Sequence, residues 1–238
     1  MKKKSIVIVP TYNEILNIEK LIFLIMNVKN NFDVLVVDDN SPDKTFDKVR
    51  KLREKFNNRL FLLLRKKKEG LGKAYLDGFN WAIKKKYDYI FQMDGDFSHD
   101  PLELDEMYKK INSGSDVVIG SRYLNGINVI NWPLSRIILS KGASYYVKLI
   151  TGIPISDPTS GFVGFKSKVL NSISLDKIKF IGYAFQIELK YKSWKKGFSL
   201  DEHSIIFKNR VKGKSKMNGS IIWEAIYGVL KLKFLKNF

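Results

Sequence analysis

Short apolar runs alternate with longer amphipathic segments through the first half of the chain, and this alternation constrains the fold more than any other feature. The apolar runs are rich in Val, Ile, Leu and Phe and are predicted to be buried strands, at residues 5–9, 32–37, 60–64, 89–93 and 117–120. The amphipathic segments are predicted to be helices, at residues 14–28, 43–56, 71–85 and 101–111. This order predicts an α/β fold with a mostly parallel, Rossmann-like sheet that is flanked by helices on both faces.

Polar residues follow every one of these predicted strands. They lie at residues 10–14, 38–43, 65–68, 94–100 and 120–123. In an open parallel sheet the carboxyl ends of the strands share one edge, and ligands bind there. The sequence therefore predicts a binding site that is assembled from several strand ends.

Two carboxylates, Asp94 and Asp96, follow the fourth predicted strand with only Gly95 between them. A glycine at this place is expected to let the backbone turn sharply, so that both acids face one point. Mg²⁺ or Mn²⁺ prefers oxygen ligands and takes one or two carboxylates from the protein, leaving room for water and phosphates. The pair thus predicts a diphosphate clamp; the alternative is an ordinary solvated turn.

Composition limits the class of protein. A chain of 238 residues with 45% hydrophobic residues has enough apolar material for one sizeable core, so a single domain is expected. It has no cysteine, which excludes disulfides and thiolate metal sites. No signal-peptide pattern and no apolar run of about 18 to 20 residues is present, so a cytosolic protein that does not cross a bilayer by itself is expected. The net charge of +18 indicates an anionic partner, or else a lysine-rich composition without one.

The second half of the chain has a less regular pattern. An amphipathic helix is predicted at residues 134–150, and a catalytic unit is expected to span residues 1–216. Residues 217–238 are predicted to form a C-terminal amphipathic helix with Ile222, Val229 and Leu232 on its apolar arc. This helix fits either a membrane surface or packing on the core.

Eight short motifs are spread over nearly the whole chain. They are PTYNE (10–14), DDNSPDKT (38–45), RKKKEGLGKAYLDGF (65–79), MDGDFSH (93–99), GSRY (120–123), DPTSGF (157–162), FQIEL (185–189) and FKNRVKGKSK (207–216). Together they resemble those of inverting glycosyltransferases of family 2 with the GT-A fold. GSRY, DPTSGF and the closing R-x-x-G-x-S-K are most similar to the polyprenyl-phosphate mannose synthases, of the dolichyl-phosphate mannose synthase type without transmembrane helices.

The resemblance implies roles for particular residues. The donor nucleotide sugar would be bound by Pro10, Tyr12, Glu14, Asp39, Lys68, Asp94, Gln186 and Lys216. The metal would be held by Asp94 and Asp96, and the acceptor phosphate by Arg122, Arg136 and Ser140. Asp96, Arg122 and Arg210 would be the catalytic residues, while Asp157, Gln186 and Glu188 would contact the sugar or order the loop over it. His99 and His203 are not expected to be metal ligands.

The implied reaction is a metal-assisted transfer of a hexose, mannose from GDP-mannose, to dolichyl or another polyprenyl phosphate. The acceptor phosphate would attack the anomeric carbon directly, which inverts the configuration and gives a β-linked product. Alternatives are a sister transferase that uses UDP-glucose or another nucleotide sugar, and a non-catalytic basic protein that binds a membrane or nucleic acid. No nucleic-acid module is recognisable, so a nucleic-acid partner is not expected.

A lipid acceptor implies contact with a membrane. The expected location is the cytoplasmic face, where the protein would be peripheral or would bind a small membrane subunit. Residues 134–150 and the C-terminal helix are the segments predicted to reach the lipid.

Overall fold

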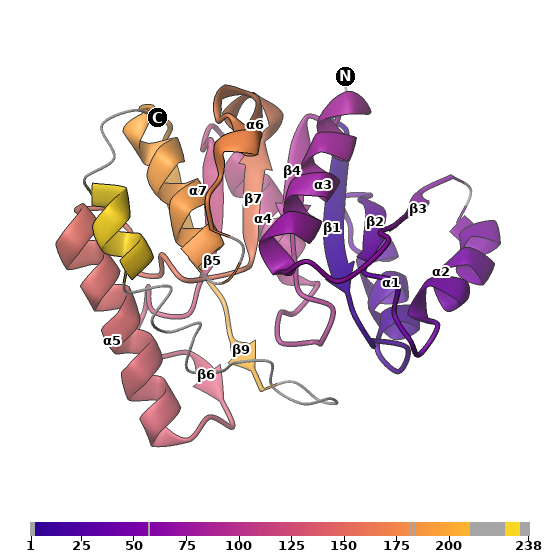
Figure 1. The fold of residues 1–238 in the computed structure, drawn as a ribbon, viewed down its shortest axis with the longest axis horizontal. Helices are drawn as coiled ribbons and strands as arrows, with labels where there is room; N and C mark the ends of the chain where they lie inside the picture. The colour runs from indigo at the N-terminus through magenta and orange to yellow at the C-terminus, as the bar shows by residue number, and fades with distance from the viewer. Residues whose placement is uncertain (1–2, 57, 181, 183, 210–226, 234–238) are drawn as a thin grey trace.

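A seven-stranded sheet forms the centre of the protein in the computed structural model, which describes residues 3–56, 58–180, 182, 184–209 and 227–233 (Figure 1). Its strands are β1 (Ser5–Thr11), β2 (Asp33–Asp38), β3 (Leu60–Leu64), β4 (Tyr89–Gln92), β5 (Val117–Ser121), β7 (Val163–Lys166) and β8 (Leu200–Ser204). They are arranged in the order β3-β2-β1-β4-β7-β5-β8, and β7 alone runs antiparallel to its neighbours. The predicted α/β class with a mostly parallel sheet is therefore confirmed.

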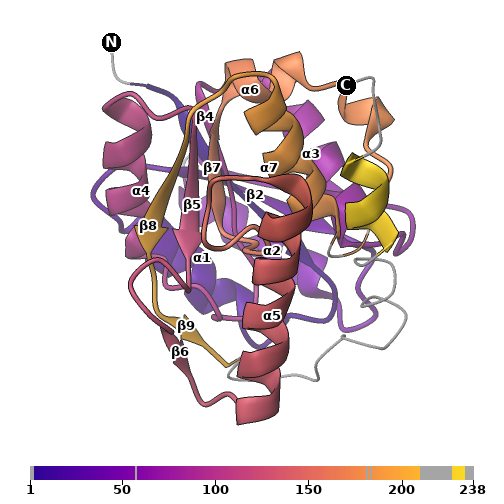
Figure 2. The ribbon, with the colours of Figure 1, turned by 90° about the vertical axis from the view of Figure 1, so that its left-hand side faces the viewer.

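Helices cover both faces of this sheet (Figures 1 and 2). The α-helices are α1 (Ile18–Met26), α2 (Thr45–Arg53), α3 (Leu71–Lys84), α4 (Glu103–Asn112), α5 (Leu134–Thr151), α6 (Ser167–Ser172) and α7 (Ala184–Lys195). Two 3₁₀ turns, η1 (Glu54–Phe56) and η2 (Leu175–Lys177), and a small parallel pair, β6 (Val129–Ile130) with β9 (Phe207–Lys208), complete the described elements.

Each central strand is apolar on both faces, and the alternation of its side chains produces two cores. In β1, Ile6 and Ile8 pack with α3, α6 and α7, whereas Val7 and Val9 pack with α1, α2 and α4. All four of these β1 residues are completely buried. A strand that is buried on both faces must read as a continuous apolar run, which explains why these strands were visible in the sequence.

The predicted elements match the structure closely in the first half of the chain and less well in the second. The five predicted strands and the helix at 134–150 are present, with ends that differ by one or two residues, and α1 begins four residues later than predicted, at Ile18. Strands β7 and β8 were missed. β8 is an edge strand of half-buried residues with the sequence LDEHS, so it carries no apolar pattern.

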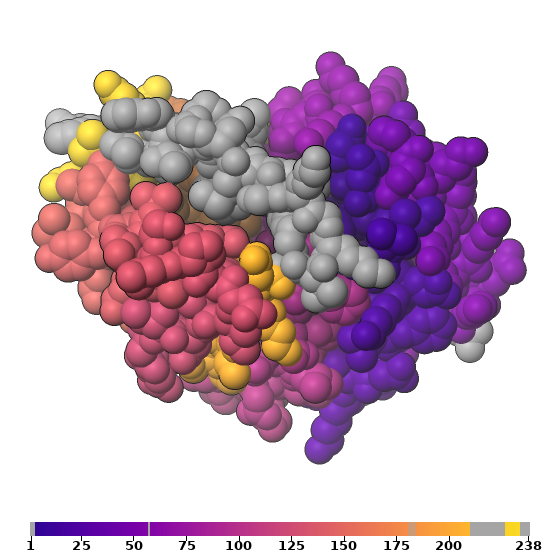
Figure 3. Space-filling view, turned by 90° about the horizontal axis from the view of Figure 1, so that it is seen from below, coloured from indigo at the N-terminus to yellow at the C-terminus, as the bar shows by residue number. Residues whose placement is uncertain are grey.

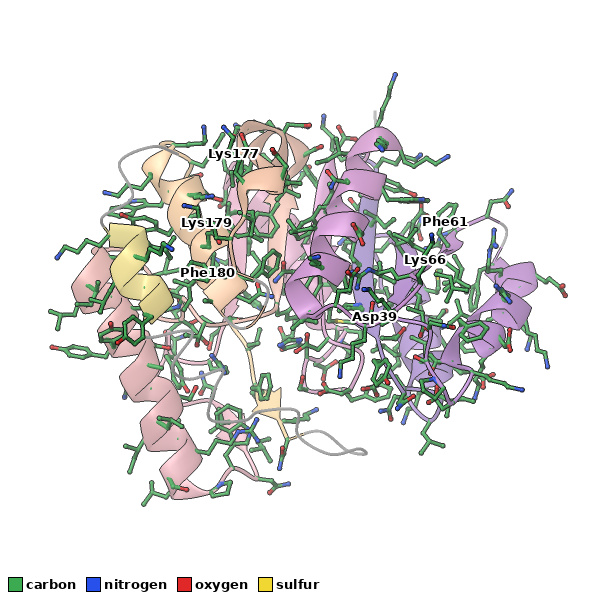
Figure 4. The ribbon with its side chains drawn as sticks, viewed as in Figure 1. Asp39, Phe61, Lys66, Lys177, Lys179 and Phe180 are labelled. Atoms are coloured by element: carbon green, nitrogen blue, oxygen red, sulfur yellow. The ribbon has the colours of Figure 1, made fainter. Side chains whose placement is uncertain are left out.

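The described part of the C-terminal segment, residues 227–233, is helical and packs on the protein. Val229 and Leu232 are completely buried in the core on the α7 side of the sheet, while Tyr227 stays 70% exposed. Gly228 lies against Phe180, whose ring carbons would be 2.9–3.0 Å from an added Cβ (Figure 4). Core packing thus accounts for one face of this helix. No described helix combines the length and the apolar character that a bilayer crossing requires.

We expect Gly164→Ala to lower the free energy of unfolding by about 1–3 kcal/mol, because overpacking of a well-filled core strains it. A Cβ at Gly164 would lie 2.5–2.7 Å from ring carbons of Phe91, and that ring is held edge-on by Phe32 at 5.2 Å. Urea unfolding measures the change. The control is Gly142→Ala in α5, where an added Cβ meets nothing within 4 Å. The control should be as stable as the wild type or more so, because alanine favours helix. Equal stabilities for both variants and the wild type would contradict this packing argument.

Candidate active site

A cavity of about 560 Å³ opens beyond the carboxyl ends of β4 and β5 and is bounded on one side by α5. Figure 3 views the molecule from this end, with the N-terminal half in indigo on one side and α5 in red on the other. Charged and polar groups line part of the cavity, among them Asp94, Asp96, Arg122, Arg136, Ser140 and Gln186. The cavity is also lined by apolar and aromatic side chains, among them Ile138, Leu139, Tyr146, Val147, Ile187 and Val229. Residues that the sequence assigned to donor, metal and acceptor therefore meet in one amphiphilic space.

The acidic loop after β4 is held by hydrogen bonds to both carboxylates. Tyr75 donates its hydroxyl to Asp94 Oδ1 at 3.2 Å, and Ser98 donates its amide and hydroxyl to Asp96 Oδ1 at 3.1 and 2.6 Å. The left-handed residue of the loop is Phe97, with φ of 64°, and not Gly95. The sharp turn that we expected at Gly95 is thus made at Phe97, and a Cβ at Gly95 would make only ordinary contacts at 3.5 Å or more.

His99 closes this loop from the interior. Its Nδ1 accepts the backbone amide of Asp94 at 3.3 Å, and its ring stacks on Phe162 with centroids 5.0 Å apart. Burial lowers the pKa of His99 to about 4, although the nearby Asp96 opposes this shift. The imidazole is therefore neutral at physiological pH and acts as an acceptor for the loop backbone.

The acidic pair fits a hard divalent cation. Among the residues that the structure describes, no group of three or more His, Cys, Asp and Glu side chains is arranged to hold a metal ion. Of the carboxylates in the described part of the chain, only Asp94 and Asp96 line the cavity. Two carboxylates next to open space are the donor set expected for Mg²⁺ or Mn²⁺ when water and substrate phosphates supply the other ligands.

Arg122 is bound through its guanidinium fork to a buried carboxylate. Its Nε and Nη2 donate to Asp157 Oδ2 and Oδ1, each at 2.7 Å, and Nη2 also donates to Thr159 Oγ1 at 2.7 Å. Asp157 is completely buried, which alone would raise its pKa, but the Arg122 guanidinium holds that pKa below its ordinary value. Asp157 therefore orders Arg122 and its own loop. The Arg122 side chain that lines the cavity therefore has a fixed orientation and a partly neutralised charge.

The other predicted acceptor residues lie on α5. The Arg136 guanidinium carbon lies 3.9 Å from the Trp132 ring centroid, and Nη1 donates to Asn209 Oδ1 at 3.1 Å. Ser140 Oγ accepts the hydroxyl of Tyr123 at 2.8 Å. Both side chains are thus presented to the cavity by aromatic neighbours, a support that the sequence motifs did not reveal.

Gln186 and Glu188, two residues apart on α7, have different surroundings. Gln186 Oε1 accepts a hydrogen bond from Gln92, and its buried Nε2 has no partner among the residues that the structure describes. An added Cβ at Gly161 would lie 3.8 Å from that Nε2 and 3.7 Å from Asp94 Oδ2, so the amide group lies near the acidic pair. Glu188 instead accepts the backbone amides of Lys179 and Phe180 at 3.0 and 3.1 Å. Glu188 therefore orders that loop.

The predicted nucleotide residues form a second group, at the ends of β1, β2 and β3, which does not line the cavity. Pro10 belongs to β1, and the Lys68 ammonium lies 4.4 Å above the Tyr12 ring. Glu14 is buried, and its Oε2 accepts a hydrogen bond from Asn17 Nδ2 at 2.8 Å. Asp39 is found near the lower edge of the sheet in Figure 4.

Arg65 was missed as a residue of this second group. Its side chain is only 6% exposed, and it pairs with Asp39, with Asp77 at 2.8 Å and with Glu69 at 3.1 Å. Burial raises the pKa of Asp39, and the Arg65 guanidinium opposes that shift. The carboxylate predicted to meet the base or ribose is therefore already engaged by an arginine. The sequence signal that could have identified Arg65 was its position directly after β3.

Arg210 and Lys216, two further predicted site residues, lie outside the described residues. His203 Nε2 lies 2.7 Å from Glu103 Oε2, away from the acidic pair. A second hollow of about 640 Å³, lined by Lys3, Asp88 and Lys166 among others, lies near the amino end of β4. Its lining, as far as the structure describes it, includes no arginine and only one carboxylate, so we assign the chemistry to the cavity.

We expect Asp157→Asn to lower the free energy of unfolding at pH 7 by about 3–5 kcal/mol, because it leaves the buried Arg122 without its carboxylate. Since the pKa of Asp157 is lowered on folding, the contribution is present above about pH 4 and is lost as the pH falls through the lowered pKa. Urea unfolding at pH 7 and pH 3 measures both effects, and the difference in stability between the wild type and the variant should be smaller at the lower pH. The control is Asp47→Asn, which removes an exposed pair with Arg50 and should cost less than about 1 kcal/mol. A variant as stable as this control at pH 7 would refute a structural role for the buried pair.

Comparisons with known proteins agree with this arrangement. Residues 6–174 match the family model described as Glycosyl transferase family 2. The chain is 39% identical to polyprenol monophosphomannose synthase of Mycolicibacterium smegmatis, over 95% of this chain and 86% of that protein. It is 36% identical to undecaprenyl-phosphate mannosyltransferase of Micrococcus luteus, over 96% and 93%. It is 35% identical to dolichol-phosphate mannosyltransferase of Pyrococcus furiosus, of which it spans 63%.

Solved structures support the fold. Glucosyl-3-phosphoglycerate synthase from Mycobacterium tuberculosis, crystallised with Mn²⁺, uridine-diphosphate and glucosyl-3-phosphoglycerate, superposes with a TM-score of 0.72 at 16% identity. The match covers 99% of this chain and 81% of that one.

Proposed function

Because the chain belongs to glycosyl transferase family 2, we propose that it transfers mannose from GDP-mannose to dolichyl or another polyprenyl phosphate. The observation that carries this proposal is the amphiphilic cavity, which is lined by an acidic pair and two arginines together with several apolar side chains. A polyprenyl phosphate has the matching shape, with a phosphate at the end of a long apolar chain. The names of the three relatives support the same lipid class and the same sugar.

The reaction needs little acid–base chemistry from the protein. The acceptor phosphate is already an anion, and its oxygen attacks the anomeric carbon in line with the departing diphosphate, which inverts the configuration and yields a β-linked product. Arg136 and Ser140 hold the acceptor phosphate, and Arg122 faces it from the end of β5. His99 does not serve as a base because its Nδ1 is occupied by the Asp94 amide. Catalysis is then mainly positioning and preorganised charge.

The donor is held at the acidic pair. Asp94 and Asp96 are the residues that would hold Mg²⁺ or Mn²⁺, and the bound ion would offset negative charge on the nucleoside diphosphate leaving group. Gln186 directs its buried, unpartnered Nε2 toward this region and is suited to donate to a sugar hydroxyl or a phosphate oxygen. Tyr12, Asp39 and Lys68, at the ends of the first three strands, bind the nucleoside.

The membrane is the proposed location of this reaction. On α5, Leu134, Ile138, Tyr145 and Leu149 are 64–70% exposed and recur at spacings of four, seven and four residues, so they form one stripe. The exposed Lys141 and Lys148 lie on the same side of the helix. Ile138 of this exposed face also lines the cavity, so the face and the cavity are continuous and suited to lipid contact. The net charge of +18 supports the anionic cytoplasmic face of a membrane.

The transfer assay is the direct test. Purified protein with Mn²⁺ or Mg²⁺, a short polyprenyl phosphate and labelled GDP-mannose should place label in the organic phase, and a chelator should abolish it. Asp96→Asn should reduce turnover by about 100-fold or more, because the diphosphate loses its metal clamp. The matched control is Asp100→Asn in the same loop, whose carboxylate pairs with Lys208 at 3.4 Å, and it should keep near-wild-type activity.

Other donors distinguish the alternatives in the same assay. Transfer from UDP-glucose and not from GDP-mannose would keep the reaction type and overturn the donor. Nucleotide binding without transfer from either donor would overturn the lipid acceptor.

The exposed face of α5 is tested by vesicle flotation. A variant with Leu134, Ile138 and Leu149 changed to Ser is expected to bind anionic vesicles at least about tenfold more weakly, because three exposed apolar side chains no longer enter the interface. The control changes Leu16 and Leu102 to Ser, which are 69% and 66% exposed and lie outside α5. Unchanged flotation of the α5 variant, or an equal loss in the control, would contradict the assignment of this face.

A further inference from the structure

Lys190, near the middle of α7, is a lysine with no exposure to solvent. Within the part of the chain that the structure describes, its ammonium makes one hydrogen bond, to the carbonyl oxygen of Ser160 at 2.7 Å. Ser160 belongs to the loop 157–161, which holds Arg122 through Asp157 and Thr159. A buried ammonium is costly unless it is compensated, so a lysine here needs a reason beyond packing.

Charged side chains of both signs surround the Lys190 ammonium. Arg122, Asp157 and Glu202 are the charged groups that act on it, from β5, the loop and β8. Glu202 accepts the backbone amides of Ser156 and Asp157 at 2.7 and 3.0 Å. Asp157 and Glu202 bring two negative charges to the surroundings of Lys190, and Arg122 brings one positive charge. Lys190 supplies a second positive charge.

We propose that Lys190 is a positioning residue that keeps the phosphate end of the cavity cationic by offsetting the charge of Asp157 behind Arg122. Asp157 fixes the orientation of Arg122 but also neutralises it. With Lys190 beneath the loop, the guanidinium keeps its geometry and less of its positive charge is offset, which favours binding of an anionic acceptor. This inference rests on the proposed function, because it requires that the anion in the cavity be the acceptor phosphate.

The protonation of Lys190 supplies an independent readout. Burial lowers the pKa of Lys190 to about 7, with Asp157 opposing this shift, Arg122 adding to it and Glu202 opposing it. The lysine is therefore charged below pH 7 and neutral above it. Affinity for the acceptor phosphate should fall as the pH rises from 6 to 8.5, and this fall should be absent in a variant without the titrating group.

The experiment compares three replacements in binding and transfer assays with a short polyprenyl phosphate in detergent. Lys190→Gln keeps a hydrogen-bond donor for Ser160 without the charge, Lys190→Met keeps neither, and Lys190→Arg keeps the charge. The dissociation constant and the KM for the acceptor should rise about tenfold at pH 6 in the Gln and Met variants, with a smaller change in kcat and in GDP affinity. The Arg variant should stay near the wild type. Lys196→Gln, an exposed lysine just after α7, is the matched control.

The outcomes separate the two levels of the proposal. If Lys190→Gln binds the acceptor as tightly as the wild type at pH 6, or loses GDP affinity equally, only the charge role is overturned. If wild-type protein binds GDP but not polyprenyl phosphate, both the acceptor assignment and this inference fail. Thermal unfolding of each variant is measured in parallel, and the Gln and Arg variants keep the test informative should the Met variant not fold.

Discussion

A strand that is buried on both faces can present polar side chains to solvent only beyond its end, and this constraint organises the molecule. Most residues of β1, β2 and β4 are apolar, because helices cover both faces of the sheet. Asp39, Asp94 and Arg122 all appear within the first two residues after a strand. The parallel arrangement then brings these ends to one edge, so the chemistry follows from how the sheet is buried.

Burial also separates the cations that form defined ion pairs from those that only add to the surface charge. The buried arginines each meet carboxylates: Arg65 pairs with Asp39, and Arg122 with Asp157. Lys192 likewise lies 2.8 Å from Glu188. A buried cation without such a partner would be costly, so these pairs fix geometry while the exposed lysines supply the long-range potential. The net charge of +18 therefore describes the surface, and the site depends on a few paired cations.

The sequence was informative where residues act through local pattern and uninformative where they act through distant partners. Apolar runs located the five strands of the first half, and the strand ends located the acidic pair. The half-polar edge strand β8 had no such pattern, and Phe97, not Gly95, adopts the left-handed conformation. Nothing local distinguishes Lys190 from exposed lysines, because its surroundings come from β5, β8 and a loop 30 residues earlier.

The binding of an anionic nucleophile presents a conflict that the geometry of Arg122 addresses. A phosphate that is held by a fully charged, unshared guanidinium is bound tightly but has its negative charge withdrawn from the attacking oxygen. Two of the nitrogens of Arg122 are committed to Asp157, so its charge is shared before any acceptor arrives. Arg136, whose guanidinium carbon lies 3.9 Å from the Trp132 ring centroid, contributes a second cation from α5. In the proposed reaction, positive potential would thus be spread over several groups around the acceptor phosphate, which favours binding while the attacking oxygen keeps its charge.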